Sequence, residues 1–409
     1  MKKKQIDSID SSDKKTSQNK IFKKSISQSK LSDIEKEIDD IFNKKYECDH
    51  SIRIESLCIK CGIEIHHSPN FVVALHESDK IIQSSKEAFQ LHLHKFYELY
   101  HNKKLILFLD LDQTLIHATL SKKPCNFSFK LHNIEFFIKK RPGLDKFLSK
   151  LSRFFEFHVY TMGTREYANY ICKILDPNKI FFGDRIVTRT ENNKMFKKYL
   201  ERITNFSNNV IILDDRVDVW GFSPNVFLIK PFYYYDTNDI NCTISKQIHT
   251  NNKLNNIAKQ VNFQNNYTTK YFKKSKNDKE LNFVYKKLRK IHKEYFRQLD
   301  SCIKSFNTTL KNLNITKITD VKEILKLNIF NNIKIICNPI YYNYVRFLGG
   351  EIIYPEQLSL LINYNNNIFI INDIQLAKKL NLQSINDIWL IKCIYRRKLI
   401  NPLLFVQKS

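Results

Sequence analysis

The sequence predicts an α/β fold built on a doubly wound parallel sheet, followed by a smaller C-terminal α/β domain. Three short and nearly all-apolar runs have the length and composition of buried parallel strands: 105–109, 155–160 and 210–213. Helical apolar patterns accompany the later runs, at 143–151, 164–175 and 194–203. Sheets of this kind bind ligands at the carboxyl edge of their strands, so candidate functional residues are expected there.

At 409 residues the chain is long enough for two or three domains. Apolar residues make up 43% and charged residues 26%, which provides packed cores and excludes a wholly disordered chain. No apolar window reaches the roughly 18 residues of a membrane span, and no apolar signal segment opens the chain, so we expect an intracellular protein with no membrane partner. Nine widely spread cysteines favour reduced thiols over disulfides.

Lys and Arg outnumber Asp and Glu by 67 to 41, a formal net charge of +26. This field attracts polyanions such as nucleic acid or a phosphorylated tail. The basic residues are dispersed among abundant Asn and Ile rather than grouped on one face, and we therefore favour a compositional bias of the genome. The charge leaves direct nucleic-acid binding open.

The first unit, residues 1–44, is predicted to be a disordered basic arm followed by a short helix. The arm, residues 1–30, holds nine lysines and few apolar residues. The helix begins at a capping box, Ser32 to Glu35, and extends to about Lys45.

Residues 45–98 form an N-terminal region with two pairs of metal-binding side chains: Cys48 and His50, then Cys58 and Cys61. Three cysteines and one histidine in two pairs suit tetrahedral Zn²⁺, and Cys-x-x-Cys-Gly is typical of a zinc knuckle. The Cys-x-His pair is tighter than usual. A structural Zn²⁺ site and loose reduced thiols therefore both stay open.

The third unit, residues 99–235, carries the apolar runs and the chemistry. Asp110 and Asp112 follow the first run and point to one side, because side chains alternate along an extended segment. One ionised Asp can attack phosphorus and form an aspartyl-phosphate, while its neighbour protonates the leaving oxygen and then activates water. Alone, Asp-x-Asp is equally typical of a solvated turn.

A second acidic pair, Asp214 and Asp215, ends another apolar run. Four carboxylates at one sheet edge repel each other unless a hard cation lies among them. Mg²⁺ prefers carboxylates, phosphate oxygens and water as ligands, and it supplies a Lewis acid for phosphoryl chemistry. The two pairs together predict a magnesium site.

Between the acidic pairs, Thr161 and Gly163 end a strand and open a helix, whose free N–H groups suit phosphate. An ordinary Thr-capped helix is the alternative. Lys198, on a predicted helix, can balance the charge of the nucleophile, although most helix lysines are simply solvated. Arg141 can clamp an incoming phosphopeptide, with a surface Arg before a turn as the alternative.

Beyond the central unit, residues 236–277 are rich in Asn, Lys and Thr and are predicted to be a linker. Residues 278–319 hold a connecting helix whose apolar residues step by three and four: Leu281, Val284, Leu288, Ile291 and Tyr295. In the last unit, residues 320–409, we expect a helix near 321–327, strands at 333–336 and 368–371, and a helix that carries Trp389.

Four motifs occur in order: Asp-Leu-Asp-Gln-Thr-Leu-Ile-His at 110–117, Arg-Pro-Gly-Leu at 141–144, Tyr-Thr-Met-Gly-Thr-Arg-Glu-Tyr-Ala at 160–168, and Asp-Asp-Arg-Val-Asp-Val-Trp at 214–220. With them the chain resembles the TFIIF-associating phosphatases of the RNA polymerase II C-terminal domain, within the haloacid dehalogenase superfamily. The resemblance runs with gaps from about residue 46 to the C-terminus. It implies a haloacid dehalogenase-like catalytic domain.

The resemblance implies a role for each matching residue. Asp110 is the nucleophile, Asp112 the general acid and base, and Thr114 supports the catalytic loop. Thr161 and Lys198 hold the phosphoryl group, with Arg141 and Gly163 at the substrate.

For the metal, the resemblance implies that Asp215 binds Mg²⁺ together with Asp110 and the backbone carbonyl of Asp112. Asp214 then orients the lysine and assists the metal. Lys194 and Lys197 are close neighbours of Lys198, so the lysine is assigned less securely than the acids.

The flanks also resemble this family. Gly349-Gly350 and Ile388-Trp389-Leu390 resemble a BRCT domain, in which the Trp fills the core. Cys337 stands where phosphopeptide-binding BRCT modules usually have Ser or Thr. We therefore expect general interaction or packing on the catalytic domain rather than phosphoserine capture.

Two departures bear on function. The segment 118–139 is shorter than is usual in the family, which reduces any substrate groove it forms. Residues 320–409 hold no acidic tail like the one with which larger relatives bind TFIIF, so a partnership with general transcription factors stays open.

The resemblance implies a nuclear, Mg²⁺-dependent protein serine/threonine phosphatase acting on the phosphorylated RNA polymerase II tail. One alternative is a nucleic-acid end phosphatase of the same superfamily. Another is a non-catalytic BRCT scaffold, which the presence of every expected carboxylate disfavours.

Overall fold

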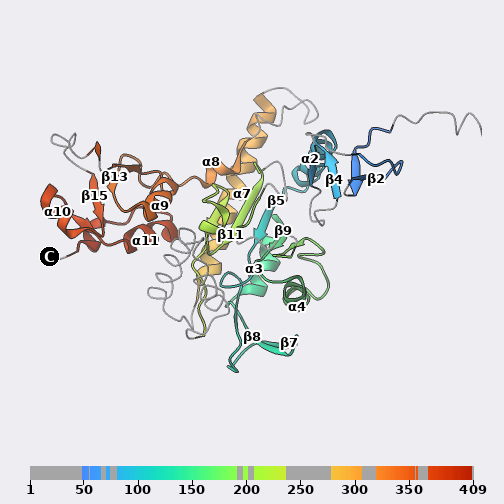
Figure 1. Cartoon of the computed structure of the whole chain (residues 1–409), viewed down its shortest axis with the longest axis horizontal. Coiled ribbons are helices and arrows are strands. Elements are labelled where there is room, and N and C mark those ends of the chain that lie inside the picture. Colours follow the sequence, from blue (N-terminus) through green and yellow to red (C-terminus); the bar gives the residue numbers. More distant parts are fainter. Residues whose placement is uncertain are drawn as a thin grey trace, which may run out of the picture.

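The computed structural model describes residues 48–54, 56–65, 71–73, 81–190, 197–200, 207–235, 278–305, 319–354, 356–357 and 367–407. The predicted arm and helix of residues 1–44 and the predicted linker of residues 236–277 lie outside them. In Figure 1 the central sheet lies between an N-terminal unit and a C-terminal unit. No helix among the described residues is both long and apolar enough to cross a membrane.

The N-terminal unit is an antiparallel sheet of four short strands in the order β2-β1-β4-β3. The strands are β1 (Ile52–Ile54), β2 (Leu57–Cys58), β3 (Phe71–Val73) and β4 (Ile81–Ser84). Strand β4 runs directly into helix α2 (Ser85–His101), where the Ser84 hydroxyl accepts a hydrogen bond from the Glu87 N–H at 3.1 Å. This N-cap fixes the helix to the end of the sheet.

The central unit holds a five-stranded sheet whose paired strands all run parallel, in the order β10-β9-β5-β11-β12. The strands are β5 (Leu105–Leu109), β9 (Phe155–Tyr160), β10 (Ile186–Val187), β11 (Val210–Asp214) and β12 (Val226–Leu228). The three strands predicted from the apolar runs are therefore confirmed. Because β5 lies in the middle, with β9 and β11 on either side, the residues that follow these three strands meet at one edge.

A small antiparallel sheet, order β6-β8-β7, is inserted after β5. It consists of β6 (Ile116–Thr119), β7 (Phe127–Leu131) and β8 (Ile134–Lys140), and its hairpin projects from the lower end of the molecule in Figure 1. The hairpin is anchored by aromatic stacking, since the Phe129 ring lies 5.3 Å from Phe136 and 5.0 Å from Tyr170.

The two faces of the central sheet pack differently. Leu105, Leu107 and Leu109 share one core with α3 (Leu144–Leu151), α4 (Arg165–Leu175) and the long helix α7 (Glu280–Ser305), as the predicted helices require. The alternate residues Ile106 and Phe108 share a second core with Trp220 and the C-terminal unit. Both faces of β5 are thus buried, which explains why its sequence is apolar without interruption.

The helix predicted at 194–203 does not form at residues 197–200, where the backbone is irregular, so the prediction is wrong there. The other residues of that range lie outside the described residues. The Lys198 N–H donates to the Val219 carbonyl at 2.8 Å, so a hydrogen bond to a distant loop takes the place of a helical bond.

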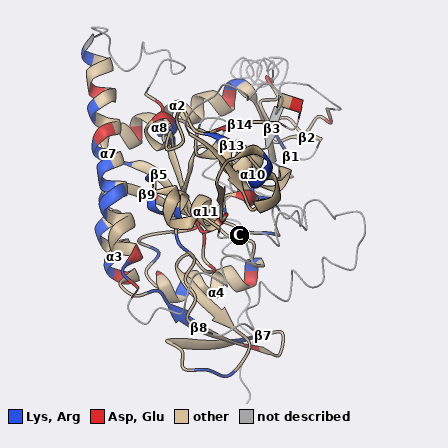
Figure 2. Cartoon of the chain, turned by 90° about the vertical axis from the view of Figure 1, so that its left-hand side faces the viewer, with Lys and Arg blue, Asp and Glu red and all other residues tan. Residues whose placement is uncertain are grey.

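Helix α7 confirms the predicted connecting helix and extends beyond its apolar stripe. All five stripe residues are buried: Leu281, Val284, Leu288, Ile291 and Tyr295. Its other positions are rich in Lys and Arg, coloured blue along the helix in Figure 2. This division is that of an amphipathic helix packed on a core.

The C-terminal unit is a parallel sheet in the order β14-β13-β15-β16. Its elements are α8 (Val321–Leu325), β13 (Lys334–Ile336), α9 (Tyr342–Phe347), β14 (Glu351–Ile352), β15 (Ile368–Ile371), α10 (Ile374–Leu380), β16 (Ser384–Ile385) and α11 (Ile388–Arg396). Short 3₁₀ turns lie at Asp218–Trp220 in the central unit and at Pro339–Tyr341 and Pro402–Phe405 here. The identity of this unit as a BRCT domain stays a prediction.

The core of the C-terminal unit is organised around Trp389, which is fully buried and stacks on Phe330 at 4.6 Å. Its indole N–H donates to the Ile400 carbonyl at 2.7 Å. Gly349 has φ +82°, and a Cβ there would lie 3.0 Å from the Leu327 carbonyl oxygen. Only glycine fits that turn without strain.

The C-terminal unit packs directly on the central sheet. Phe222 meets Tyr344 edge to face at 4.8 Å, and the Arg397 guanidinium lies 4.6 Å from the Phe227 ring. The Tyr395 hydroxyl also donates to the backbone carbonyl of Asp215 at 3.2 Å. This unit therefore supports the loop that carries the second acidic pair.

A partly buried ion pair makes the stability of the central unit sensitive to acid. Glu156 on β9 accepts hydrogen bonds from Lys95 Nζ at 2.7 Å and from His158 Nε2 at 2.9 Å. Burial alone raises the pKa of this carboxyl, but the two donors outweigh it and lower the pKa from 4.5 to about 2. A depressed carboxyl pKa stabilises the fold above the unfolded-state pKa, and the contribution is lost as the pH falls toward 2.

We expect Glu156→Gln to lower the free energy of unfolding at pH 7 by on the order of 1–2 kcal/mol, since the lysine is partly solvated. Urea unfolding, repeated in steps from pH 7 to pH 3, measures the free energy of unfolding of the variant and of wild type. The difference between the two free energies should become smaller below about pH 4.5. The exposed pair of Glu294 and Arg297 supplies the control, Glu294→Gln, which should change the free energy of unfolding much less because water screens the pair. A difference that stays constant over this pH range would contradict the assignment.

Candidate active site

Three neighbouring strands bring the predicted acids and the predicted threonine to one sheet edge. Asp110 follows β5 directly, Asp214 ends β11, and Thr161 follows β9. The Asp110 N–H donates to the Leu213 carbonyl at 3.1 Å, which holds the start of the loop after β5 beside β11. This loop, residues 110–115, is called the catalytic loop for its predicted role. The carboxyl edge of the sheet is therefore the candidate active site.

Lys198 lies between the two acidic pairs. Its Nζ is 2.6 Å from Asp110 Oδ1 and 2.6 Å from Asp214 Oδ2, and all three side chains are buried. Of the neighbouring lysines, Lys197 is exposed and Lys194 lies outside the described residues. The structure thus places Lys198 beside the acids on a backbone that is not helical, and its predicted role stays a prediction.

Aromatic side chains enclose this lysine. The Trp220 indole N–H donates to Asp214 Oδ2 at 2.8 Å, and the Tyr160 ring meets Trp220 edge to face at 5.1 Å. The Lys198 ammonium lies 5.5 Å from the Trp220 ring and 5.8 Å from the Tyr160 ring. These contacts fix the lysine and exclude water around it.

The buried charges perturb each other. Burial raises the pKa of Asp110 to about 7, against the opposing effect of Lys198. Burial and the charges of Asp214 and Asp110 raise the pKa of Asp215 well above its usual value. Burial alone lowers the pKa of the Lys198 ammonium, but Asp110 and Asp214 outweigh it and raise that pKa.

The acidic group fits a metal ion. One carboxylate oxygen from each of Asp110, Asp214 and Asp215 lies within 4.8 Å of the others, and all three residues are buried. Within this group Lys198 supplies one positive charge, which leaves excess negative charge when the acids ionise. Hard oxygen donors around excess negative charge suit a divalent cation, and these three residues could hold one.

Thr114 ties the catalytic loop to this acidic group. Its hydroxyl accepts a hydrogen bond from the Asp215 N–H at 3.1 Å and lies 3.4 Å from Asp215 Oδ1. Its carbonyl accepts a hydrogen bond from Arg141 at 2.9 Å. Thr114 is fully buried, and these bonds join its loop to Asp215 and to Arg141.

Asp112 is half-buried, and it bonds to a residue that the sequence did not single out. The Tyr167 hydroxyl, on α4, donates to Asp112 Oδ1 at 2.7 Å. Gly163 makes room for this tyrosine, since a Cβ there would lie 2.6 Å from the Tyr167 ring. The Gly163 N–H donates to the Thr161 hydroxyl at 3.0 Å, which orders the turn after β9.

The Arg141 guanidinium hydrogen-bonds to three groups of the protein itself, more than a residue that only binds substrate would need. Its guanidinium is buried and donates to Asp278 at 3.0 Å and to the Lys230 carbonyl at 2.7 Å, besides its bond to Thr114. It therefore joins the catalytic loop, the segment after β12 and the start of α7. Its predicted role at the substrate stays a prediction.

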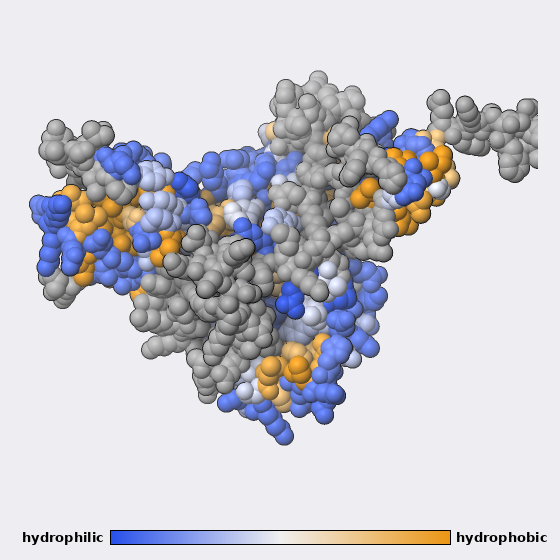
Figure 3. All heavy atoms as spheres, viewed as in Figure 1, coloured by the Kyte–Doolittle hydropathy of each residue, from blue (hydrophilic) through white to orange (hydrophobic). Residues whose placement is uncertain are grey.

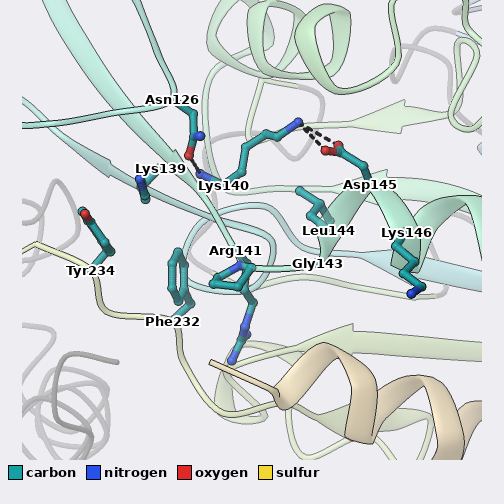
Figure 4. A pocket seen from close by; sticks show the side chains of 11 residues that line it. Asn126, Lys139, Lys140, Arg141, Gly143, Leu144, Asp145, Lys146, Phe232 and Tyr234 are labelled. Carbon is teal, nitrogen blue, oxygen red and sulfur yellow. Dashed lines mark hydrogen bonds and ion pairs between the residues drawn. The ribbon is translucent and has the colours of Figure 1, made fainter. Parts of the chain in front are cut away.

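A pocket of about 650 Å³ opens beside Arg141, as Figure 4 shows. Basic and aromatic side chains dominate its lining, which is formed by Asn126, Lys139, Lys140, Arg141, Pro142, Gly143, Leu144, Asp145, Lys146, Phe232 and Tyr234. Lys140 is paired with Asp145 at 2.7 Å, and Lys139 lies 4.6 Å from the Tyr234 ring. The pocket is electropositive and adjoins the catalytic loop through Arg141.

The sequence motifs contained three aromatic residues whose contacts were not anticipated: Tyr160, Tyr167 and Trp220. Each lies in a motif next to a predicted site residue, and this position is the feature of the sequence that could have indicated a role at the site. No spacing rule indicates that an indole or phenol reaches a carboxylate across the sheet edge, because those contacts depend on tertiary packing.

Comparisons with known proteins agree with this geometry. Residues 105–249 match the family model described as NLI interacting factor-like phosphatase. The chain is 42% identical over 197 residues to the RNA polymerase II C-terminal domain phosphatase of Encephalitozoon cuniculi, covering 47% of this chain and 48% of that protein. The corresponding human protein is 34% identical over 233 residues, covering 51% of this chain and 24% of its own length.

The solved structures include that of a fission yeast RNA polymerase II C-terminal domain phosphatase bound to beryllium fluoride. It aligns with a TM-score of 0.62 and 22% identity, covering 78% of this chain and 100% of that one. This likeness confirms the predicted α/β fold with a parallel sheet. The chain spans less than half the length of the curated relatives named above.

Proposed function

We propose that this chain, whose residues 105–249 match the model of the NLI interacting factor-like phosphatase family, is a Mg²⁺-dependent protein serine/threonine phosphatase. Its substrate would be the phosphorylated C-terminal repeat domain of RNA polymerase II, as the names of its relatives suggest. One observation carries the proposal: Lys198 joins the carboxylates of Asp110 and Asp214 at 2.6 Å in a buried site. A nuclear location follows from the substrate.

In the first step, the Asp110 carboxylate attacks the phosphorus of phosphoserine and the bond to the serine oxygen breaks. Asp112 donates a proton to that leaving oxygen, which departs as the serine hydroxyl. In the second step, Asp112 takes a proton from water, which attacks the aspartyl-phosphate. Inorganic phosphate leaves and the Asp110 carboxylate is restored.

The other residues of the site would bind the transferring group. Lys198 and the Thr161 hydroxyl would be donors for phosphoryl oxygens. Asp110 and Asp215, with the Asp112 carbonyl, would hold Mg²⁺, and Asp214 would orient Lys198. The bound ion supplies a Lewis acid that neutralises phosphoryl charge.

We further propose that residues 99–235 form the catalytic domain, with 45–98 before it, 278–319 connecting it, and 320–409 as a BRCT domain that packs on it. The buried Trp389 and the four parallel strands support this division. Cys337 directly follows β13 in this unit. A packing role suits the contacts of Tyr344 and Tyr395 better than phosphoserine capture does.

Tyr167 acts as a positioning residue for the proposed general acid. Because its hydroxyl fixes Asp112 Oδ1 at 2.7 Å, we expect Tyr167→Phe to lower kcat about tenfold while KM stays within twofold. Steady-state phosphate release from a phosphopeptide measures both constants. Tyr170→Phe, on the same helix and 43% exposed, is the control and should keep both. An equal loss in the two variants, or a change in KM alone, would contradict this role.

The substrate class is tested by comparing turnover on phosphorylated heptad-repeat peptides with turnover on 5′- or 3′-phosphorylated oligonucleotides. A protein phosphatase should prefer the peptide by at least about a hundredfold in kcat/KM. The electropositive pocket lined by Lys139 and Lys146 suits a chain carrying several phosphates. Preference for the oligonucleotide would replace the protein substrate with a nucleic-acid end.

A further inference from the structure

The N-terminal unit brings four potential metal ligands together. Cys48 Sγ lies 3.5 Å from Cys58 Sγ, and Cys61 Sγ lies 3.3 Å from His50 Nδ1. One ligand atom from each of the four lies within 4.8 Å of the others. Tetrahedral ligands about 2.3 Å from Zn²⁺ stand about 3.8 Å from each other, so this cluster has the dimensions of a zinc site.

The chain turns sharply between Cys58 and Cys61, which brings the two cysteines of the Cys-x-x-Cys pair together. The Gly62 N–H donates to the Cys58 carbonyl at 2.8 Å and closes this turn, and Gly62 has φ +71°. Glycine fits the left-handed turn without strain.

Strands β1 and β2 of the N-terminal sheet bury little apolar surface. In these strands and the turns beside them, residues 48–54 and 56–65, Cys58 is the buried apolar side chain, while Ile54, Leu57, Ile59 and Ile63 are 47–57% exposed. Figure 3 shows apolar surface over this unit, at the upper right. Strands of two to four residues with so little burial require another source of stability.

We propose that Cys48, His50, Cys58 and Cys61 bind one structural Zn²⁺ ion that holds the N-terminal sheet together ahead of α2. Four protein ligands fill a tetrahedral shell and leave no open position for substrate, so the ion is structural. Thiolate and imidazole ligands select Zn²⁺, whereas the all-carboxylate group of the central sheet suits Mg²⁺. The site is independent of the proposed phosphatase chemistry.

Metal analysis of the purified full chain tests this proposal directly. We expect about one zinc per chain after gel filtration in zinc-free buffer, falling to less than a fifth in Cys58→Ser and in Cys61→Ser. Cys125→Ser, a cysteine outside the cluster, and Asp110→Asn, at the carboxylate group, should keep the full content. Zinc-free wild type after incubation with ZnSO₄, or full zinc content in Cys58→Ser, would overturn the proposal.

Cysteine alkylation mapped by mass spectrometry gives a second readout that does not depend on the folding of a variant. In wild type, Cys48, Cys58 and Cys61 should react at least tenfold faster after a chelator is added, while Cys125 is unaffected. Rapid reaction without chelator would show loose thiols. Protection removed by a reductant but not by a chelator would show a disulfide, and both results would contradict the zinc site.

Hydrogen exchange distinguishes a structural ion from a peripheral one. Chelation should accelerate exchange of the β1 and β2 amides at least tenfold and leave β5 unchanged. Unchanged exchange in β1 and β2 would contradict a structural role.

Discussion

Asp110→Asn should abolish phosphate release, with a loss of about a thousandfold or more in kcat. The substitution exchanges one carboxylate oxygen for an amide of the same shape, and an amide cannot form the aspartyl-phosphate. The ion pair between Lys198 Nζ and Asp214 Oδ2, at 2.6 Å, is kept in the variant. The repulsion among the three buried acids is reduced, because one of them is no longer charged. We therefore expect a folded protein without turnover.

The loss is measured as phosphate release from a phosphorylated heptad peptide, together with acid-quench detection of the covalent phosphoenzyme. Asp184→Asn, at an aspartate that is 90% exposed, is the matched control and should keep wild-type activity. Turnover retained in Asp110→Asn would show that another group is the nucleophile. A phosphoenzyme trapped in that variant would show the same.

Lys198→Met should damage both activity and stability. Methionine keeps the length of the side chain but leaves Asp110 and Asp214 buried without the ammonium that contacts both at 2.6 Å. Removing one partner of a buried ion pair costs about 3–5 kcal/mol, because the remaining charge is uncompensated. We expect kcat to fall about a hundredfold to a thousandfold, since the phosphoryl oxygens also lose a donor.

Urea unfolding and steady-state kinetics measure the two effects in the same preparation. The control is Lys197→Met, the exposed neighbour, which should change unfolding by less than about 0.5 kcal/mol and leave kcat unchanged. If Lys197→Met were the more damaging variant, the lysine of the site would be misassigned. A stable and active Lys198→Met protein would contradict the electrostatic account altogether.

Much of the catalytic fold was predictable from local patterns. Buried parallel strands have nearly continuous apolar sequences, so 105–109 and 210–213 could be predicted as strands. The carboxyl ends of these strands then indicated Asp110 and Asp214 as candidate site residues. Five apolar residues of α7, which are spaced three and four positions apart, likewise predicted a helix with one buried face. These features repeat with the period of a single element and need no knowledge of tertiary contacts.

What could not be predicted depends on contacts between distant segments. Lys198 has a helical sequence pattern around it, yet its N–H bonds to Val219 and its backbone is irregular. The bond from Tyr167 to Asp112 joins residues 55 positions apart. The packing of Tyr344 and Tyr395 on the central sheet likewise has no local signature, because tertiary packing overrides local preference.

The most direct test of the proposed function is phosphate release from a phosphorylated heptad-repeat peptide by the purified full chain, measured with Mg²⁺ and with EDTA. We predict steady turnover with Mg²⁺ and a loss of at least about a hundredfold with EDTA, restored when Mg²⁺ is added in excess. A folded protein that releases no phosphate from the peptide with Mg²⁺ present, or one that is equally active in EDTA, would contradict the account.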